Sequence, residues 1–242
     1  MKIVADLHVH TVASGHAFGT IWETARRAVE IGLTLVAITD HGPAMPGGTH
    51  RYYFGNLPIL PSVIEGVHVL RGVEANIKDT QGGLDVPPRY LHKLDWVAAG
   101  LHSDCIEPGS VEENTAAMLA AMQSGLVDAI VHPGNPRFPI DKEAFVDAAV
   151  RYGVAMEINN ASLTLPHRRG SEGNCTALAR LAAEKGASIS LGSDAHSPWQ
   201  LGVLDSAVRL AIAAGVTEDQ ILNTSHEKIR AFLAERRTRR NA

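Results

Sequence analysis

The sequence predicts an α/β fold in which a parallel β-sheet closes into a barrel of the TIM type. Short apolar segments alternate with longer amphipathic ones along the whole chain, a pattern typical of parallel strands buried on both faces. The chain has 242 residues, near the usual size of a barrel of βα units. Polar residues follow many different strands, whereas an open doubly wound sheet gathers them at one switch point.

Periodicity places the individual elements. Short β-rich apolar segments predict strands at residues 3–9, 35–39, 68–73, 96–101, 129–131, 154–158 and 188–192. Longer amphipathic patterns predict helices at residues 20–31, 57–65, 111–124, 142–151, 176–184, 201–213 and 226–236.

Glycines mark the predicted helix ends, where a left-handed residue is favoured. They are Gly32, Gly66, Gly125, Gly153, Gly186 and Gly215. No linker, low-complexity segment or shift in composition divides the chain. We therefore expect residues 1–242 to form a single domain.

The overall composition excludes several classes of protein. A net charge of −4 gives no electrostatic footprint for nucleic acid, and no apolar stretch is long enough to span a membrane. Two cysteines are too few for a disulfide framework. With no export signal visible, we expect a cytoplasmic protein. The arginines near the C-terminus, from Arg236 to Arg240, predict a cationic helix end that continues into a frayed tail.

Histidine is unusually frequent, with twelve histidines against six lysines. His8 and His10 occupy the first predicted strand, and residues two apart point to the same face, about 6.6 Å apart. Two imidazoles at this spacing converge on one ion, although two surface histidines on an edge strand would give the same pattern. The motif alone is therefore ambiguous.

Most of the other predicted strands also finish on ligand-type side chains. Six of the seven end on a His, Asp or Glu, and beyond His8 and His10 these side chains are His41, Glu74, His102, His132, Asp194 and His196. Because the carboxyl ends of barrel strands meet at one mouth, we expect a metal centre there. The donors are nitrogen and oxygen without thiolate, which suits zinc, manganese or iron.

The number of candidates indicates more than one ion. With His16 included there are nine, whereas a tetrahedral ion takes four protein ligands, or three and a water. Nine ligands suffice for two or three ions if Glu74 bridges a pair. Clustered metals typically serve the hydrolysis of phosphate esters.

Specific motifs carry a resemblance to a known family. Around the ligands stand Asp-Leu-His-Val-His-Thr (6–11), Ser-x-His (14–16), Thr-Asp-His-Gly (39–42) and Gly-Ser-Asp-x-His (192–196). Further motifs are Arg-Gly-x-Glu-Ala-Asn-Ile-Lys (71–78), His-Pro-Gly-Asn-Pro (132–136), Glu-Ile-Asn-Asn (157–160) and Arg-Gly-Ser-Glu-x-Asn-Cys (169–175). Together they resemble the PHP (polymerase and histidinol phosphatase) superfamily, and within it the YcdX-like phosphatases.

The resemblance implies a distorted (β/α)7 barrel with three zinc ions at the C-terminal mouth of the strands. It implies His8, His10, Glu74 and Asp194 for the first ion, Glu74, His102 and His132 for the second, and His16, His41 and His196 for the third. Glu74, Asp194 and His41 would then act in catalysis through metal ligation. Mn²⁺ or Fe²⁺ would suit the same donors. Cys105, in a segment that departs from the family, is expected to be an idle thiol.

Other residues are candidates for supporting roles. Asp6 and Asp40 adjoin ligands and would orient imidazoles through the second ring nitrogen, or would be buried carboxylates satisfied by backbone amides. Glu157 would act as an outer-shell base or as a hydrogen-bond acceptor at the mouth. Candidates for binding substrate phosphate are Arg71, Lys78, His167, Arg168 and Arg169.

These expectations define a metal-dependent phosphatase. A metal-bound hydroxide would attack a small phosphomonoester in line, with no phosphoenzyme intermediate, and the sequence singles out no general acid. One alternative is an amidohydrolase-like enzyme acting on amides or lactones, although His16, His41 and His196 favour the phosphatase. Another is a metal-binding structural module without turnover. A homo-oligomer is possible.

Overall fold

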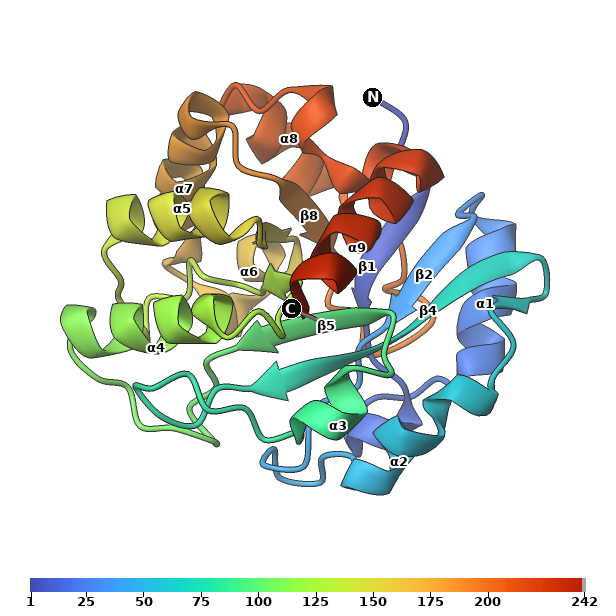
Figure 1. Cartoon of the computed structure of the whole chain (residues 1–242). Coiled ribbons are helices and arrows are strands. Elements are labelled where there is room, and N and C mark those ends of the chain that lie inside the picture. The colour runs from blue at the N-terminus through green and yellow to red at the C-terminus, as the bar shows by residue number, and fades with distance from the viewer. Residues whose placement is uncertain (241–242) are drawn as a thin grey trace.

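The protein is described by a computed structural model that covers residues 1–240, apart from the side chain of His167. Parallel strands form a sheet that curves into a nearly closed barrel, which confirms the predicted α/β barrel (Figure 1). In spatial order the strands are β1 (Ala5–Val9), β2 (Leu35–Ile38), β4 (Val67–Asn76), β5 (Trp96–Gly100), β6 (Ala129–Ile130), β7 (Ala155–Asn159) and β8 (Ile189–Gly192).

The first and last strands close the barrel. A parallel bridge joins Val9 to Ala195, and the Asp194 amide donates to the His8 carbonyl at 3.0 Å. These bonds lie at the carboxyl ends of β1 and β8, so closure brings the segments after both strands together.

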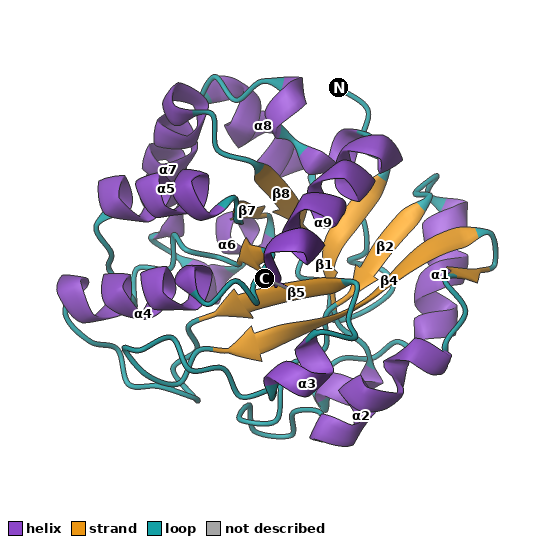
Figure 2. Cartoon of the chain, viewed as in Figure 1, coloured by secondary structure: helices purple, strands orange, loops and turns teal. Residues whose placement is uncertain are grey.

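Helices surround the barrel on its outside, and the last of them, α9, lies across one end (Figure 2). They are α1 (Ile21–Glu30), α2 (Arg51–Asn56), α3 (Pro88–Leu91), α4 (Val111–Gln123), α5 (Lys142–Tyr152), α6 (Ala161–Thr164), α7 (Ser171–Lys185), α8 (Asp205–Ala213) and α9 (His226–Arg240), with 3-10 turns η1 (Val12–Ser14), η2 (Leu57–Ile59), η3 (Pro166–Arg168), η4 (Glu218–Gln220) and η5 (Leu222–Thr224). None of the helices within the described residues is both long and apolar enough to cross a membrane.

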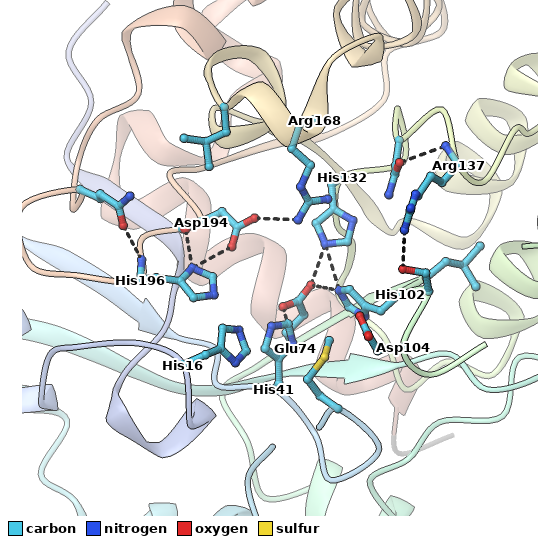
Figure 3. Close-up of a pocket in the computed structure, with 16 residues that line it drawn as sticks. His16, His41, Glu74, His102, Asp104, His132, Arg137, Arg168, Asp194 and His196 are labelled. Carbon is cyan, nitrogen blue, oxygen red and sulfur yellow. Dashed lines mark hydrogen bonds and ion pairs between the residues drawn. The ribbon is translucent and has the colours of Figure 1, made fainter. Parts of the chain in front are cut away.

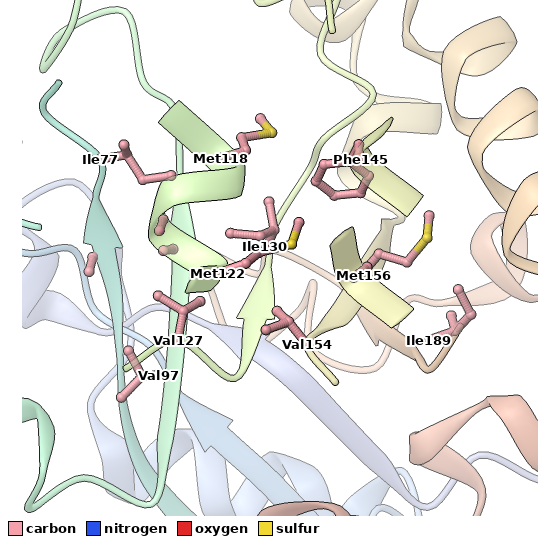
Figure 4. Close-up of a cluster of buried hydrophobic side chains, with 14 of the residues drawn as sticks. Ile77, Val97, Met118, Met122, Val127, Ile130, Phe145, Val154, Met156 and Ile189 are labelled. Carbon is pink, nitrogen blue, oxygen red and sulfur yellow. The ribbon is translucent and has the colours of Figure 1, made fainter. Parts of the chain in front are cut away.

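The main core lies between the sheet and the helices (Figure 4). Ile130 and Met156 project from β6 and β7 and pack with Met122 of α4 and Phe145 of α5 in one buried cluster. A separate cluster fills the barrel interior, where Trp96 lies with Ile229 and other residues of α9. Helix α9 therefore plugs one end of the barrel.

The predicted helix at 57–65 is wrong. Only the turn η2 forms there, and strand β3 (Val63–Ile64) pairs antiparallel with the start of β4. Pro61 has no amide hydrogen to donate within a helix, and Glu65 and Gly66 take positive φ values of 52° and 84°, which suit a two-residue hairpin turn. A short helix, α2, precedes this hairpin and was not predicted.

Strand β4 is also longer than predicted. It continues to Asn76, which pairs with Gly100 of β5, so Glu74 lies within the strand instead of after it. Helix α7 starts earlier than predicted, at Ser171, and α8 starts later, at Asp205.

The predicted arginine tail is wrong for Arg236 and Arg240, which are buried within α9. Arg236 donates to the carbonyls of Tyr152 and Val127 at 2.6 and 2.5 Å, and Arg240 pairs with the buried carboxylate of Asp128. The helix C-terminus thus binds the loops that precede the strands, at the end of the barrel opposite the strand carboxyl ends.

Candidate metal centre

A cavity of about 610 Å³ opens at the carboxyl ends of the strands (Figure 3). Seven of the nine predicted ligands line it, and the other two, His8 and His10, are buried against them. Each comes from the end of a strand or the loop that follows. The topology therefore gathers all nine at one place, although they are spread over almost 190 residues of sequence.

His8, within β1, and His10, directly after it, point to the same side, as the strand alternation predicts. Both are buried, and their Nε2 atoms lie 3.0 Å apart. His8 Nδ1 lies 2.7 Å from Glu157 Oε1, which can only accept, so Nδ1 carries a proton. Ser14 Oγ donates to Asp40 and accepts from His10 Nδ1 at 3.2 Å.

When both rings are neutral, this arrangement leaves the two Nε2 atoms facing each other with lone pairs. Such a contact is repulsive unless a proton or a cation lies between them. Protonation on Nδ1, fixed by an outer acceptor, is also the state in which Nε2 ligates a metal. The pair formed by His8 and His10 therefore fits a cation.

Glu74 lies at the centre of the cluster. Its Oε1 atom lies 2.9 and 2.8 Å from Nε2 of His102 and His132. Its Oε2 atom lies 2.9 Å from Nδ1 of His41 and 3.3 Å from Nε2 of His8. With one oxygen toward each group of imidazoles, Glu74 has the geometry of a bridging carboxylate.

Asp194 completes the group around β1. Its Oδ1 atom lies 3.2 Å from His10 Nε2 and 3.6 Å from His8 Nε2. Asp194 and His132 both have positive φ, 56° and 35°, a conformation that costs a non-glycine residue free energy and recurs at functional sites. In both cases the strained backbone follows a strand and aims a side chain at the cluster.

His16, His41 and His196 form a stacked group at the rim. The ring centroid of His16 lies 5.2 Å from that of His41 and 4.8 Å from that of His196. His10 also stacks on His196, at 4.3 Å, and it is His10, His41 and His196 whose nitrogens lie close enough together to hold one ion. His16 is exposed and lies beside this group.

The donor atoms fit divalent metal ions. Three groups each bring their ligand atoms within 4.8 Å of one another: His10, His41 and His196; His8, His10 and Asp194; and His41, Glu74 and His102. Within the described residues, the buried atoms His41 Nδ1 and Glu74 Oε2 make no hydrogen bond, and they contact only each other and neighbouring candidate ligands. Buried polar atoms without partners are uncommon and need an explanation, which bound cations would provide.

The pKa shifts of the buried carboxyl groups also indicate that the cluster favours nearby positive charge. Burial opposes ionisation of Glu74, but the neighbouring His41 and His8 hold its pKa well below the ordinary value. For Asp194 too, burial is outweighed, chiefly by His8, and the pKa is held well below normal. Burial lowers the pKa of His102 to about 4. Ionised carboxylates and a neutral imidazole are the forms that bind metal.

Of the three carboxylates predicted to support the candidate ligands, Glu157 has the most direct contact with one. Besides binding His8, it accepts from the His132 amide at 2.8 Å and from Asn159 Nδ2 at 3.1 Å. A single buried carboxylate thus holds two candidate ligands from different strands in place.

The two aspartates differ. Asp40 accepts from Thr11, Ser14 and Tyr53, and therefore reaches His10 only through the Ser14 hydroxyl. Asp6 accepts from the backbone amides of His8, Ser193 and Gly202. It matches the alternative prediction of a buried carboxylate satisfied by backbone amides.

Gly192 has no side chain, and this allows Glu157 and His8 to pack closely against its backbone and against each other. A Cβ atom at this position would overlap Glu157 Oε1 and would lie 2.5 Å from the Cβ of His8. Gly192→Ala is expected to lower metal content and to reduce any metal-dependent activity by roughly 10- to 100-fold, as for other losses of outer-shell support.

The matched control for this prediction is Gly173→Ala. Gly173 lies in α7, and a Cβ there would meet nothing within 4 Å, so metal content and activity should match wild type. Elemental analysis of both purified variants checks the prediction. Full metal occupancy in the Gly192 variant would contradict it.

The phosphate candidates are only partly gathered at the cavity. Arg168 lines it, with Nη2 3.5 Å from Asp194 Oδ2. The structure does not support Arg71 as a phosphate-binding residue. The pairing of Gly72 with Trp96 places Arg71 beside Asp95, away from the cavity, and its guanidinium binds that carboxylate at 2.6 Å. Lys78 and Arg169 are exposed and do not line the cavity. The His167 side chain lies outside the described part of the structure.

Several cavity residues were not predicted. They come from loops and include Met45, Ser103, Asn135, Arg137, Leu165 and Gln200. Cys105 does not line the cavity, and burial raises the pKa of its thiol to about 12, as expected of an unreactive thiol. Arg137 follows the His-Pro-Gly-Asn-Pro motif directly, so its position after a strand end was the available signal.

Comparisons with known proteins identify a family. Residues 6–132 match the PHP domain family. A probable phosphatase of Caldanaerobacter subterraneus subsp. tengcongensis is 51% identical over 240 residues, which cover 99% of this chain and 94% of that protein. A probable phosphatase of Thermoanaerobacter sp. is 50% identical over 238 residues, 98% of this chain and 97% of the other.

A solved structure shares the fold. Histidinol phosphate phosphatase from Lactococcus lactis subsp. lactis, complexed with zinc, L-histidinol and phosphate, aligns with a TM-score of 0.58 at 17% identity. The alignment covers 88% of this chain and 94% of that one. From the family match and the high identity over nearly the full length, we conclude that this chain belongs to the PHP domain family.

Proposed function

We propose that this protein is a metal-dependent phosphatase that hydrolyses small phosphomonoesters. The observation that carries the proposal is the convergence of imidazoles from several strands on the two oxygens of one buried carboxylate, Glu74. The names of the two relatives reported above support the same activity.

The residues present suffice for three ions. His8, His10, Asp194 and one oxygen of Glu74 would hold the first, and His102, His132 and the other oxygen of Glu74 the second. His41 and His196, with His10 or His16, would hold the third. The nitrogen and oxygen donors suit zinc, as in the Lactococcus protein of the same fold, and also Mn²⁺ or Fe²⁺.

The protein's own groups bind and position the ester. Divalent ions bound there supply positive charge to the phosphate oxygens and lower the pKa of water toward neutrality. Arg168 lies at the edge of the cluster, and its guanidinium can turn from Asp194 to a phosphate oxygen. Glu157 holds His8 and the His132 backbone rigid, so that the ligands need little reorganisation during the reaction.

A panel assay tests the proposal. The purified protein is stripped of metal, reloaded with Zn²⁺ or Mn²⁺, and assayed with p-nitrophenyl phosphate, p-nitrophenyl acetate, a lactone and an amide. We expect hydrolysis of the phosphomonoester only, lost on chelation and restored by metal, with two to three ions per chain by elemental analysis. A preference for the lactone or amide would indicate the amidohydrolase alternative. Metal binding without any turnover would indicate a structural module.

A further inference from the structure

The metal cluster accounts for only one side of the cavity. The loops after β5 and β6 form another wall and bring Ser103, Asp104, Asn135 and Arg137 to it (Figure 3). A volume of about 610 Å³ is typical of sites that enclose a whole small molecule. If the scissile phosphate lies at the metal cluster, the leaving group of the ester lies against this second wall.

Arg137 is the cationic group of that wall, and two hydrogen bonds orient it although the residue is exposed. Its Nη1 atom donates to Ser103 Oγ at 3.0 Å, and its backbone amide donates to Asn135 Oδ1 at 3.1 Å. The next residue, Phe138, is buried and anchors the segment. Part of the ordering cost of a guanidinium contact is therefore already met in the free protein.

Among the described residues, no carboxylate pairs with the charge of Arg137. Its hydrogen-bond partner is a neutral hydroxyl, and it forms no ion pair with any carboxylate of the described residues. Arg168 differs, since it points to Asp194 beside the metal ligands (Figure 3). The cavity thus presents two guanidinium groups on different loops, one at the cluster and one on the leaving-group side.

We propose that Arg137 binds a second anionic group, carried by the leaving group of the substrate. The preferred substrates are then phosphomonoesters with a further phosphate or carboxylate, because both oxyanions match the planar donor pattern of arginine. This inference rests on the proposed phosphatase function. Asp104 lines the same wall and would instead favour an amine, an alternative that the following experiment separates.

Binding is measured first, without turnover. The metal-loaded protein is titrated calorimetrically with ω-phosphonoalkanoates of increasing chain length and with alkylphosphonates of the same lengths. At the length that spans the cavity, the carboxylate-bearing ligand should bind about tenfold more tightly, as expected for one hydrogen bond to a charged group. Arg137→Ala should abolish that difference, and Arg137→Lys should keep part of it.

Kinetics then separate the two anion types. Fructose 1,6-bisphosphate is compared with fructose 6-phosphate, and 3-phosphoglycerate with glycerol 3-phosphate. Arg137→Ala should raise KM about tenfold for the member of a pair that carries the additional anion, with little change for its partner. The pair that responds identifies phosphate or carboxylate. Arg151→Ala, which removes an exposed arginine on α5, should leave both unchanged.

Two results would overturn the inference. One is an equal loss for both members of each pair in the Arg137→Ala variant, and the other is tighter binding of aminoalkylphosphonates, which would assign the wall to Asp104. If the wild-type protein hydrolyses no phosphomonoester, the proposed function fails. The calorimetric comparison would still decide whether Arg137 recognises an anion.

Discussion

Glu74→Gln should remove most of the metal and reduce phosphomonoester hydrolysis by at least about 100-fold, the upper figure for loss of an outer-shell partner. The amide keeps the size of the side chain but removes the negative charge between the two groups of imidazoles. One amide nitrogen would also face either His41 or the pair of His102 and His132, where it offers no lone pair to a metal. Elemental analysis and a p-nitrophenyl phosphate assay measure the effect.

The matched control is Glu184→Gln, an exposed glutamate near the end of α7. It makes the same chemical change away from the cavity and should keep full metal content and activity. A thermal melt of the chelated proteins distinguishes loss of metal from loss of fold. If Glu74→Gln retained two or three ions per chain, the bridging role would be wrong.

Asp128→Asn should destabilise the fold without altering the metal centre directly. Asp128 is fully buried and pairs with the buried arginines Arg236 and Arg240 of α9. Removing one partner of a buried ion pair leaves uncompensated charge and typically costs about 3–5 kcal/mol. For a chain of this length the melting temperature should fall by roughly 6–20 °C.

Asp147→Asn is the control for that prediction. Asp147 also pairs with a cation, Lys185, but its side chain is 64% exposed, and surface pairs contribute little. Its melting temperature should be unchanged. Calorimetric melts of chelated protein measure both variants, and equal stability of the Asp128 variant and wild type would show that the buried pair is dispensable.

Much of the fold follows from local sequence patterns. The alternation of apolar runs predicted each of the barrel strands, because a strand that is buried on both faces appears as a short run of consecutive apolar residues. Segment 57–65 misled the prediction because Pro61 and the Glu65-Gly66 turn outweigh its apolar spacing. The hairpin there depends on pairing with Val67 and His68, which periodicity alone does not reveal.

The sequence by itself determined that the nine candidate metal ligands meet at the barrel mouth. His8, Glu74 and His132 stand at strand ends, and parallel strands in a barrel bring their carboxyl ends together whatever the loops do. The types of the candidate ligands, and with them the range of metals that would suit them, follow from the same residues.

Only the tertiary structure decided what the arginines do. Arg71 and Arg168 look alike in sequence as phosphate-binding candidates, yet Arg71 pairs with Asp95 and Arg168 lines the cavity. Arg236 is buried, while Arg137, directly after the His-Pro-Gly-Asn-Pro motif, reaches the cavity wall. A long flexible side chain takes its role from whichever carboxylates and carbonyls the packed elements bring within its reach, and those partners are distant in sequence.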